Sequence, residues 1–190
     1  GAGASTPQLQ NGGTISAASG NTAASLATAV KIESGASLPA LRNSGTIKAS
    51  TGENGTAVAI RDASGTLTLI ENSGTISATG AKADSGRNIA IDLSGTTTDV
   101  TIRQTEVAAT YTAPAITGDV RLGSGNDTFT IADGTVTGNV TFGGGNDTLA
   151  LSGDAVQTGK VTFGSGTDAM RLAGTSRFTG TADFGGGADT

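Results

Sequence analysis

The stretch that decides the fold is VTFGGGNDTLAL, residues 140–151, in which a glycine-rich corner separates two short runs of alternating apolar residues. Three segments match it position by position: VRLGSGNDTFTI from Val120, VTFGSGTDAMRL from Val161 and ADFGGGADT from Ala182. The motif recurs every 20 or 21 residues, and a fixed period of this order is typical of solenoid proteins. Because apolar residues stand two apart within each segment, the repeat predicts short β-strands with one buried face.

Stacking the repeats on one another predicts which side chains face inward. The expected columns are Val120, Val140, Val161 and Ala182; Leu122, Phe142, Phe163 and Phe184; Phe129, Leu149 and Met170; Ile131, Leu151 and Leu172; and Val136, Val156 and Phe178. The pattern runs in one direction with no helix between repeats. Neighbouring coils should therefore pair as parallel strands, with about three strands to a coil.

The first half of the chain contains a longer repeat of the same kind. QNGGTI from Gln10, RNSGTI from Arg42 and ENSGTI from Glu71 recur at intervals of about 30 residues. The apolar pairs that lie between them are Val30 and Ile32, Val58 and Ile60, and Ile89 and Ile91. The further column of Asn11, Asn43 and Asn72 predicts either a plain turn signal or a ladder of hydrogen-bonded amides.

These repeats predict an all-β fold, a single continuous parallel β-solenoid of roughly eight coils over residues 1–190. Long coils of about 30 residues should fill residues 9–97, and short coils of 20–21 residues should fill residues 118–190. Residues 98–117 match neither repeat and are expected to form a transition coil. Because the sequence stops inside a repeat, at DFGGGADT, we interpret it as an excerpt of a longer chain.

Composition excludes several classes of partner and chemistry. A formal charge of −5 with scattered Lys and Arg argues against nucleic acid, which needs clustered basic residues. Histidine and cysteine are both absent, which removes histidine catalysis, thiol nucleophiles, disulfides and nearly every transition-metal site. An ion bound here must be a hard one held by oxygen. No apolar run is long enough to span a membrane in this segment.

An enzymatic role is not expected from this sequence. Many β-helices process polysaccharides, and that chemistry needs paired carboxylates with aromatic platforms for the sugar. Five of the six aromatic residues are phenylalanines, and the predicted columns place them in the core. Only Tyr111 is left free, and the acidic residues outside the glycine corner show no repeated spacing that would build a pair.

The order of NSGTI coils followed by GDVRLGSGNDTFTI and GNVTFGGGNDTLAL coils resembles the passenger regions of bacterial autotransporters, in particular large surface proteins of alphaproteobacterial type. The likeness runs from about Gln10 to the last residue. It implies a right-handed parallel β-helix at the cell surface or outside the cell, attached to the outer membrane by a β-barrel translocator that lies beyond this segment. It also implies a non-catalytic structural or adhesive role, with a surface ligand or neighbouring copies of the chain as partners.

A second resemblance is to the calcium-binding RTX nonapeptide, G-G-x-G-x-D-x-(apolar)-x. FGGGNDTLA, residues 142–150, fits it except at the first glycine, where Phe142 stands, and Leu122, Phe163 and Phe184 repeat that departure. RTX repeats also recur after about nine residues, whereas here one motif occurs in each coil. The alternative function is therefore a calcium-stabilised module of RTX character.

The structural and the calcium-binding alternatives differ in the role they give to four aspartates, which should stack in one column: Asp127, Asp147, Asp168 and Asp189. Carboxylates roughly 5 Å apart repel by about 3 kcal/mol at an effective dielectric of about 20, so the column needs relief. Solvent, hydrogen bonds from turn amides, or a calcium ion shared between coils would each supply it. The sequence favours the turn because the glycine and aspartate corner persists while its neighbours change.

Overall fold

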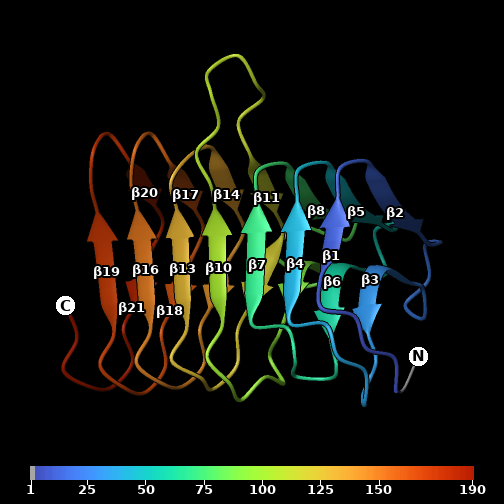
Figure 1. Cartoon of the computed structure of the whole chain (residues 1–190), viewed down its shortest axis with the longest axis horizontal. Helices are drawn as coiled ribbons and strands as arrows, with labels where there is room; N and C mark the ends of the chain where they lie inside the picture. The colour runs from blue at the N-terminus through green and yellow to red at the C-terminus, as the bar shows by residue number, and fades with distance from the viewer. Residues whose placement is uncertain (1–2) are drawn as a thin grey trace.

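The computed structural model describes residues 3–190, and it confirms a solenoid built from three parallel sheets (Figure 1). Each sheet contains seven of the strands found in that range, and the chain visits the three sheets in turn, so one strand from each makes a coil. The described chain therefore forms seven coils, where the repeat spacing predicted roughly eight. Every strand pairs only with the matching strands of the coils before and after it.

Sheet 1 consists of β1 (Leu9–Asn11), β4 (Ala40–Asn43), β7 (Leu69–Asn72), β10 (Thr101–Gln104), β13 (Thr128–Ile131), β16 (Thr148–Leu151) and β19 (Ala169–Leu172). Sheet 2 consists of β2 (Thr14–Ala18), β5 (Thr46–Ser50), β8 (Thr75–Thr79), β11 (Ala115–Thr117), β14 (Thr135–Thr137), β17 (Val156–Thr158) and β20 (Arg177–Thr179). Sheet 3 consists of β3 (Leu26–Ile32), β6 (Thr56–Asp62), β9 (Asn88–Asp92), β12 (Asp119–Arg121), β15 (Val140–Thr141), β18 (Val161–Thr162) and β21 (Ala182–Asp183).

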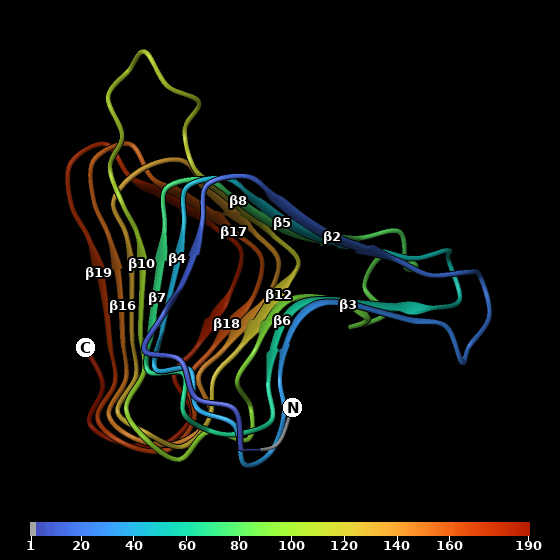
Figure 2. The same cartoon turned by 45° about the vertical axis from the view of Figure 1, so that its right-hand side comes forward.

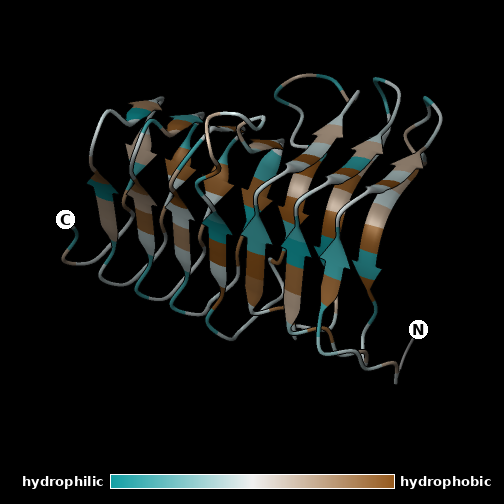
Figure 3. Cartoon of the chain, turned by 45° about the horizontal axis from the view of Figure 1, so that its top comes forward, coloured by the Kyte–Doolittle hydropathy of each residue, from teal (hydrophilic) through white to brown (hydrophobic). Residues whose placement is uncertain are grey.

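The core lies between the sheets, and most of the predicted columns are found there. The strand registers align Val120 with Val140 and Val161, and Phe129 with Leu149 and Met170, as the repeats predicted. The phenylalanines of the corner stack face to face, with ring centroids 4.8 Å apart for Phe142 and Phe163 and 4.9 Å apart for Phe163 and Phe184. Apolar bands on the strands stand out in Figure 3. Each coil buries its apolar side chains against its neighbours.

One predicted alignment is wrong. Val136 lies beside Gln157 and not beside Val156, because the turn after β16 holds one more residue than the turn after β13. Gln157 is fully buried and donates from Nε2 to the carbonyl of Gly138 over 3.0 Å. In the long coils, Val30 aligns with Ile60, whereas Val58 and Ile60 align with Ile89 and Ile91 of the next coil.

A flat wing distinguishes the long coils from the short ones, and Figure 2 shows it extending to the right. It consists of the far ends of the sheet 2 and sheet 3 strands together with the connections 19–25, 51–55 and 80–87. The two sheets approach closely in the wing, so small residues fill the space between them. Its buried side chains include Ala27, Ala49, Ala57 and Ala78.

In the short coils a turn with a single glycine replaces the wing between sheets 2 and 3; it is distinct from the glycine-rich corner between sheets 3 and 1. Gly118, Gly138, Gly159 and Gly180 occupy this turn with φ of 115°, 146°, 134° and 152°. A Cβ at Gly138 would stand 2.3 Å from the carbonyl oxygen of Gly118 in the coil below. Glycine is therefore required both by the positive φ and by the close stacking of backbones.

Residues 98–117 contribute β10 and β11 to the fourth coil, so this segment belongs to the solenoid although it matches neither repeat. The residues between these strands, 105–114, leave the solenoid as the loop that projects at the top of Figure 1. In the described range, residues 3–190, the chain has no helix that is long and apolar enough to cross a membrane.

Candidate functional site

The four aspartates singled out from the repeats stack at one corner of the solenoid. Asp127, Asp147 and Asp168 directly precede β13, β16 and β19, and their exposed fractions are only 1%, 1% and 0%. Asp189 continues the column in the last turn and is half-buried. We call these four residues the carboxylate column. Its position is the turn between sheet 3 and sheet 1, next to the stacked phenylalanines.

Each carboxylate in the column accepts a hydrogen bond from the backbone of the preceding coil. The amide of Val100 donates to Oδ1 of Asp127 over 2.8 Å, and the amide of Asp127 donates to Oδ1 of Asp147 over 2.8 Å. The series continues with the amides of Asp147 and Asp168, which donate to Asp168 and Asp189 over 2.8 and 2.9 Å. The column is thus a ladder that joins five successive coil corners.

The asparagines beside these aspartates bond in the opposite direction. Oδ1 of Asn126 accepts from the amide of Asn146 in the next coil over 2.9 Å, and Oδ1 of Asn146 accepts from the amide of Thr167 over 2.7 Å. An Asn-Asp pair therefore joins its coil to both neighbours, forward through asparagine and backward through aspartate. The pair occurs at two of the four corners, and Thr167 and Ala188 precede the aspartate at the other two.

The second oxygen of the carboxylates has no such partner. Oδ2 of Asp127, Asp147 and Asp168 is buried and makes no hydrogen bond within the described chain. A buried charge without a partner is costly, so burial favours the neutral acid at Asp127 and Asp147. Burial raises the pKa of Asp127 to about 7, and it raises the pKa of Asp147 to about 6. A proton on Asp127 or Asp147 therefore relieves the repulsion between these two neighbours.

Other carboxylates add to this effect. The charge of Asp147 raises the pKa of Asp127, and the charge of Asp168 raises the pKa of Asp147, while the backbone hydrogen bonds lower both. Asp99 in the fourth coil also raises both values, and its Oδ1 accepts from the amide of Asn126 over 2.7 Å. The repeats did not identify Asp99, because its segment lacks the glycine corner that marks the other coils.

The ligands that the column could offer a calcium ion are limited by its hydrogen bonds. Calcium takes about six to eight oxygen ligands, and here one oxygen of each aspartate already accepts a backbone amide. Among residues 3–190 no group of three or more acidic side chains is arranged to hold a metal ion. The hydrogen bonds from turn amides supply one of the three forms of relief expected from the sequence, and calcium binding by the column stays a prediction.

A second ladder runs through the long coils and confirms the amide alternative for the asparagine column. Nδ2 of Asn11 donates to Oδ1 of Asn43 over 2.8 Å, and Nδ2 of Asn43 donates to Oδ1 of Asn72 over 2.8 Å. Gln104 extends the ladder by accepting from Asn72 over 3.3 Å. In the next coil the same position is Ile131, so the column changes there from amides to aliphatic side chains.

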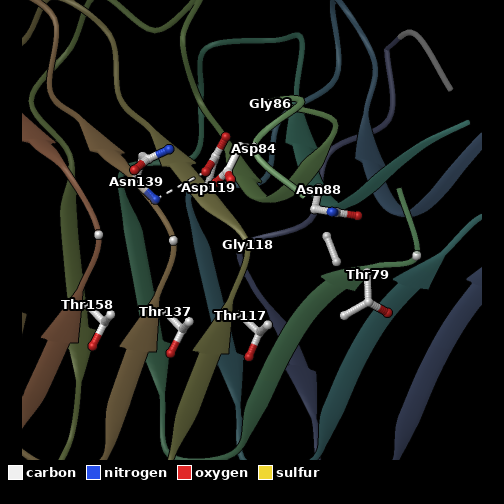
Figure 4. Close-up of a pocket in the computed structure, with 14 residues that line it drawn as sticks. Thr79, Asp84, Gly86, Asn88, Thr117, Gly118, Asp119, Thr137, Asn139 and Thr158 are labelled. Carbon is white, nitrogen blue, oxygen red and sulfur yellow. Dashed lines mark hydrogen bonds between the residues drawn. The ribbon is translucent and has the colours of Figure 1, made fainter. Parts of the chain in front are cut away.

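The step between long and short coils forms a polar recess of about 390 Å³, drawn in Figure 4. Thr117, Thr137 and Thr158 lie in a row along it, with Asp119 and Asn139 above them. The carboxylate of Asp119 is already used, since it accepts from the amide of Asn139 and lies 3.5 Å from Arg121. The charged group of this recess therefore bonds within the protein, at the turn between sheets 2 and 3.

Comparisons with protein-family models, with curated proteins and with solved structures found no match to this chain. The resemblance to autotransporter passenger regions and to RTX repeats rests on sequence motifs alone. The structure shows the parallel solenoid fold and identifies no family.

We expect the solenoid to be more stable at about pH 5 than at about pH 8. The folded pKa values lie above the ordinary value of 3.8, so the folded chain holds more protons than the unfolded chain in this window. The stabilisation is complete below about pH 4 and is lost as the pH rises through about 6 to 7. Thermal melts followed by circular dichroism should show a midpoint lower by roughly 5 °C at the higher pH.

Asp147→Asn supplies the matched test, because the amide keeps the shape of the acid without its charge. The variant should lose part of the difference between the two pH values, and Asp154→Asn, at an exposed turn, should keep all of it. Equal pH dependence in the Asp147→Asn variant and the parent chain would contradict the buried-proton explanation.

The calcium hypothesis makes a different prediction, which the same melts decide at a constant pH of about 7. We expect millimolar calcium to leave the midpoint within about 2 °C of its value in chelator, because nothing in the hydrogen-bonded column requires an ion. Magnesium is the control for a general effect of charge screening. A rise of more than a few degrees that calcium gives and magnesium does not would show that the column binds calcium.

Proposed function

We propose that this chain is a non-catalytic scaffold segment of a secreted or surface-displayed bacterial protein, similar to an autotransporter passenger region. Its role is to hold adhesive or contact surfaces away from the cell. Attachment to the membrane belongs to a translocator elsewhere in the parent protein. The partners of the segment are a surface ligand or neighbouring copies of the chain.

The observation that carries this proposal is the continuity of the polar ladders from coil to coil. The amide ladder runs from Asn11 to Gln104, and the carboxylate column runs from Asp127 to Asp189. Each coil is bonded to its neighbours at its corners as well as along its strands. Such a structure extends by adding coils, which suits a stalk whose length matters more than any single site.

The segments that project from the regular coils also support a role in display. The wing and the loop 105–114 project from the sheets, whereas the repeated coils are nearly uniform (Figures 1 and 2). Variable segments held on a rigid scaffold are the usual place for binding surfaces. The sequence resemblance supports the same role, since it rests on the number and order of the repeats.

Surface display is tested on intact cells that make the parent protein. Lys48, Lys82 and Lys160 are exposed, so a membrane-impermeant amine reagent should label all three before the cells are lysed. Labelled peptides are measured by mass spectrometry in intact and lysed cells, with a cytoplasmic protein as the negative control. Labelling of these lysines only after lysis would contradict the proposal.

A further inference from the structure

The loop 105–114 carries an aromatic side chain into solvent. Tyr111 is 73% exposed and is the single tyrosine of a chain that has no tryptophan. The base of the loop is anchored, because the amide of Val107 donates to Oδ2 of Asp133 over 3.0 Å. A turn follows, in which the amide of Tyr111 donates to the carbonyl of Ala108 over 2.8 Å. The ring is therefore presented on a loop with a defined conformation.

A recess of about 590 Å³ lies between this loop and the start of the sheet 2 strands in the second and third coils. We call it the Tyr111 recess. Hydroxyl side chains line its floor, namely Ser44, Thr46, Ser73 and Thr75, and none of the described residues that line it is charged. Its volume falls within the range of about 300–1,000 Å³ that is usual for small-ligand sites.

The hydroxyl groups of the recess are available to a ligand. The side-chain oxygens of Thr46 and Thr75 have no hydrogen-bond partner among residues 3–190. Ser44 and Ser73 make only long bonds, of 3.4 and 3.5 Å, to backbone carbonyls of the preceding coil. Each hydroxyl can both donate and accept, so the floor can match ligand hydroxyls in either sense.

The opposite side of the loop has a different character. The recess there is about 720 Å³, and Tyr111 lines it too, together with the acidic residues Glu106, Asp133 and Asp154. The two recesses share the tyrosine ring and differ in charge, so an uncharged ligand is matched better by the Tyr111 recess, whose described lining residues are all uncharged. A protein partner would need a larger apolar centre than one tyrosine provides.

We propose that the Tyr111 recess binds a neutral saccharide of a surface glycan. The apolar face of one sugar ring stacks on Tyr111, and its hydroxyl groups bond to the threonine and serine side chains of the floor. This assignment rests on the proposed adhesive function and names the ligand class for it. The tyrosine supplies contact area, and the hydroxyls set the orientation.

The chain contains its own probe for this site, because all of its tyrosine fluorescence comes from Tyr111. The purified chain is titrated with four neutral hexasaccharides: cellohexaose, maltohexaose, mannohexaose and chitohexaose. We expect at least one to give a saturable fluorescence change. Calorimetry of that sugar should show affinity weakened by about tenfold or more in Tyr111→Ala and largely kept in Tyr111→Phe.

Thr75→Val removes one floor hydroxyl at nearly constant shape and should weaken the same sugar by about threefold to tenfold. Thr158→Val, on the same sheet but outside the recess, is the matched control and should bind normally. These threonines and Tyr111 lie at the surface, so we expect each variant to fold. Circular dichroism melts check this.

Three results would overturn the assignment: no saturable change with any of the four sugars, binding that Tyr111→Ala and Thr75→Val leave unaltered, or binding confined to a charged sugar such as a hyaluronan hexasaccharide. None of these results bears on the lysine labelling of intact cells. The saccharide site can therefore fail while surface display stands, and labelling only after lysis would remove the display role while leaving a measured sugar site in place.

Discussion

The solenoid depends on how the backbone amides at the corners of its coils are satisfied. Along the strands, the coils above and below supply every partner, but at the corners the chain turns away from the sheet. Buried amides without partners would be costly, and acceptors from neighbouring coils remove that cost. At the corner before β13, β16 and β19, aspartate oxygens accept from the coil before, and before β13 and β16 asparagine oxygens also accept from the coil after.

Using aspartate as the acceptor stacks carboxylates of successive coils on one another, and the other features of the corner are consistent with this stacking. One oxygen of each buried aspartate is bonded and the other has no partner within the described chain, and burial raises the pKa of Asp127 and of Asp147. The stacked turns also leave no room for side chains: a Cβ at Gly145 would lie 2.1 Å from the carbonyl of Gly125. Glycine and aspartate therefore recur at all four corners, whereas asparagine precedes the aspartate at two of them and Thr167 and Ala188 precede it at the others.

Much of this could be predicted from the sequence, because a period of about 20 residues fixes which positions stack. The columns of Phe142 and of Phe129 follow directly from it. The period could not show the extra residue in the turn after β16, so the apolar Val156 was placed where the buried Gln157 lies. Gln104 and Asp99 were missed for a related reason. Gln104 continues the amide ladder, and Asp99 continues the asparagine series by accepting from the amide of Asn126 in the next coil. Both lie in a coil whose sequence matches neither repeat, so only their alignment in space identifies them.

Amide hydrogen exchange, measured residue by residue by NMR in Asp147→Ala and Asn146→Ala, tests the two-way corner most directly. Removing the aspartate should speed exchange at the amide of Asp127 in the coil before, and removing the asparagine should speed exchange at the amide of Thr167 in the coil after. Each variant should leave the other amide protected. Loss of protection at the same amides in both variants, or at neither, would contradict the claim that each corner is bonded to both neighbouring coils.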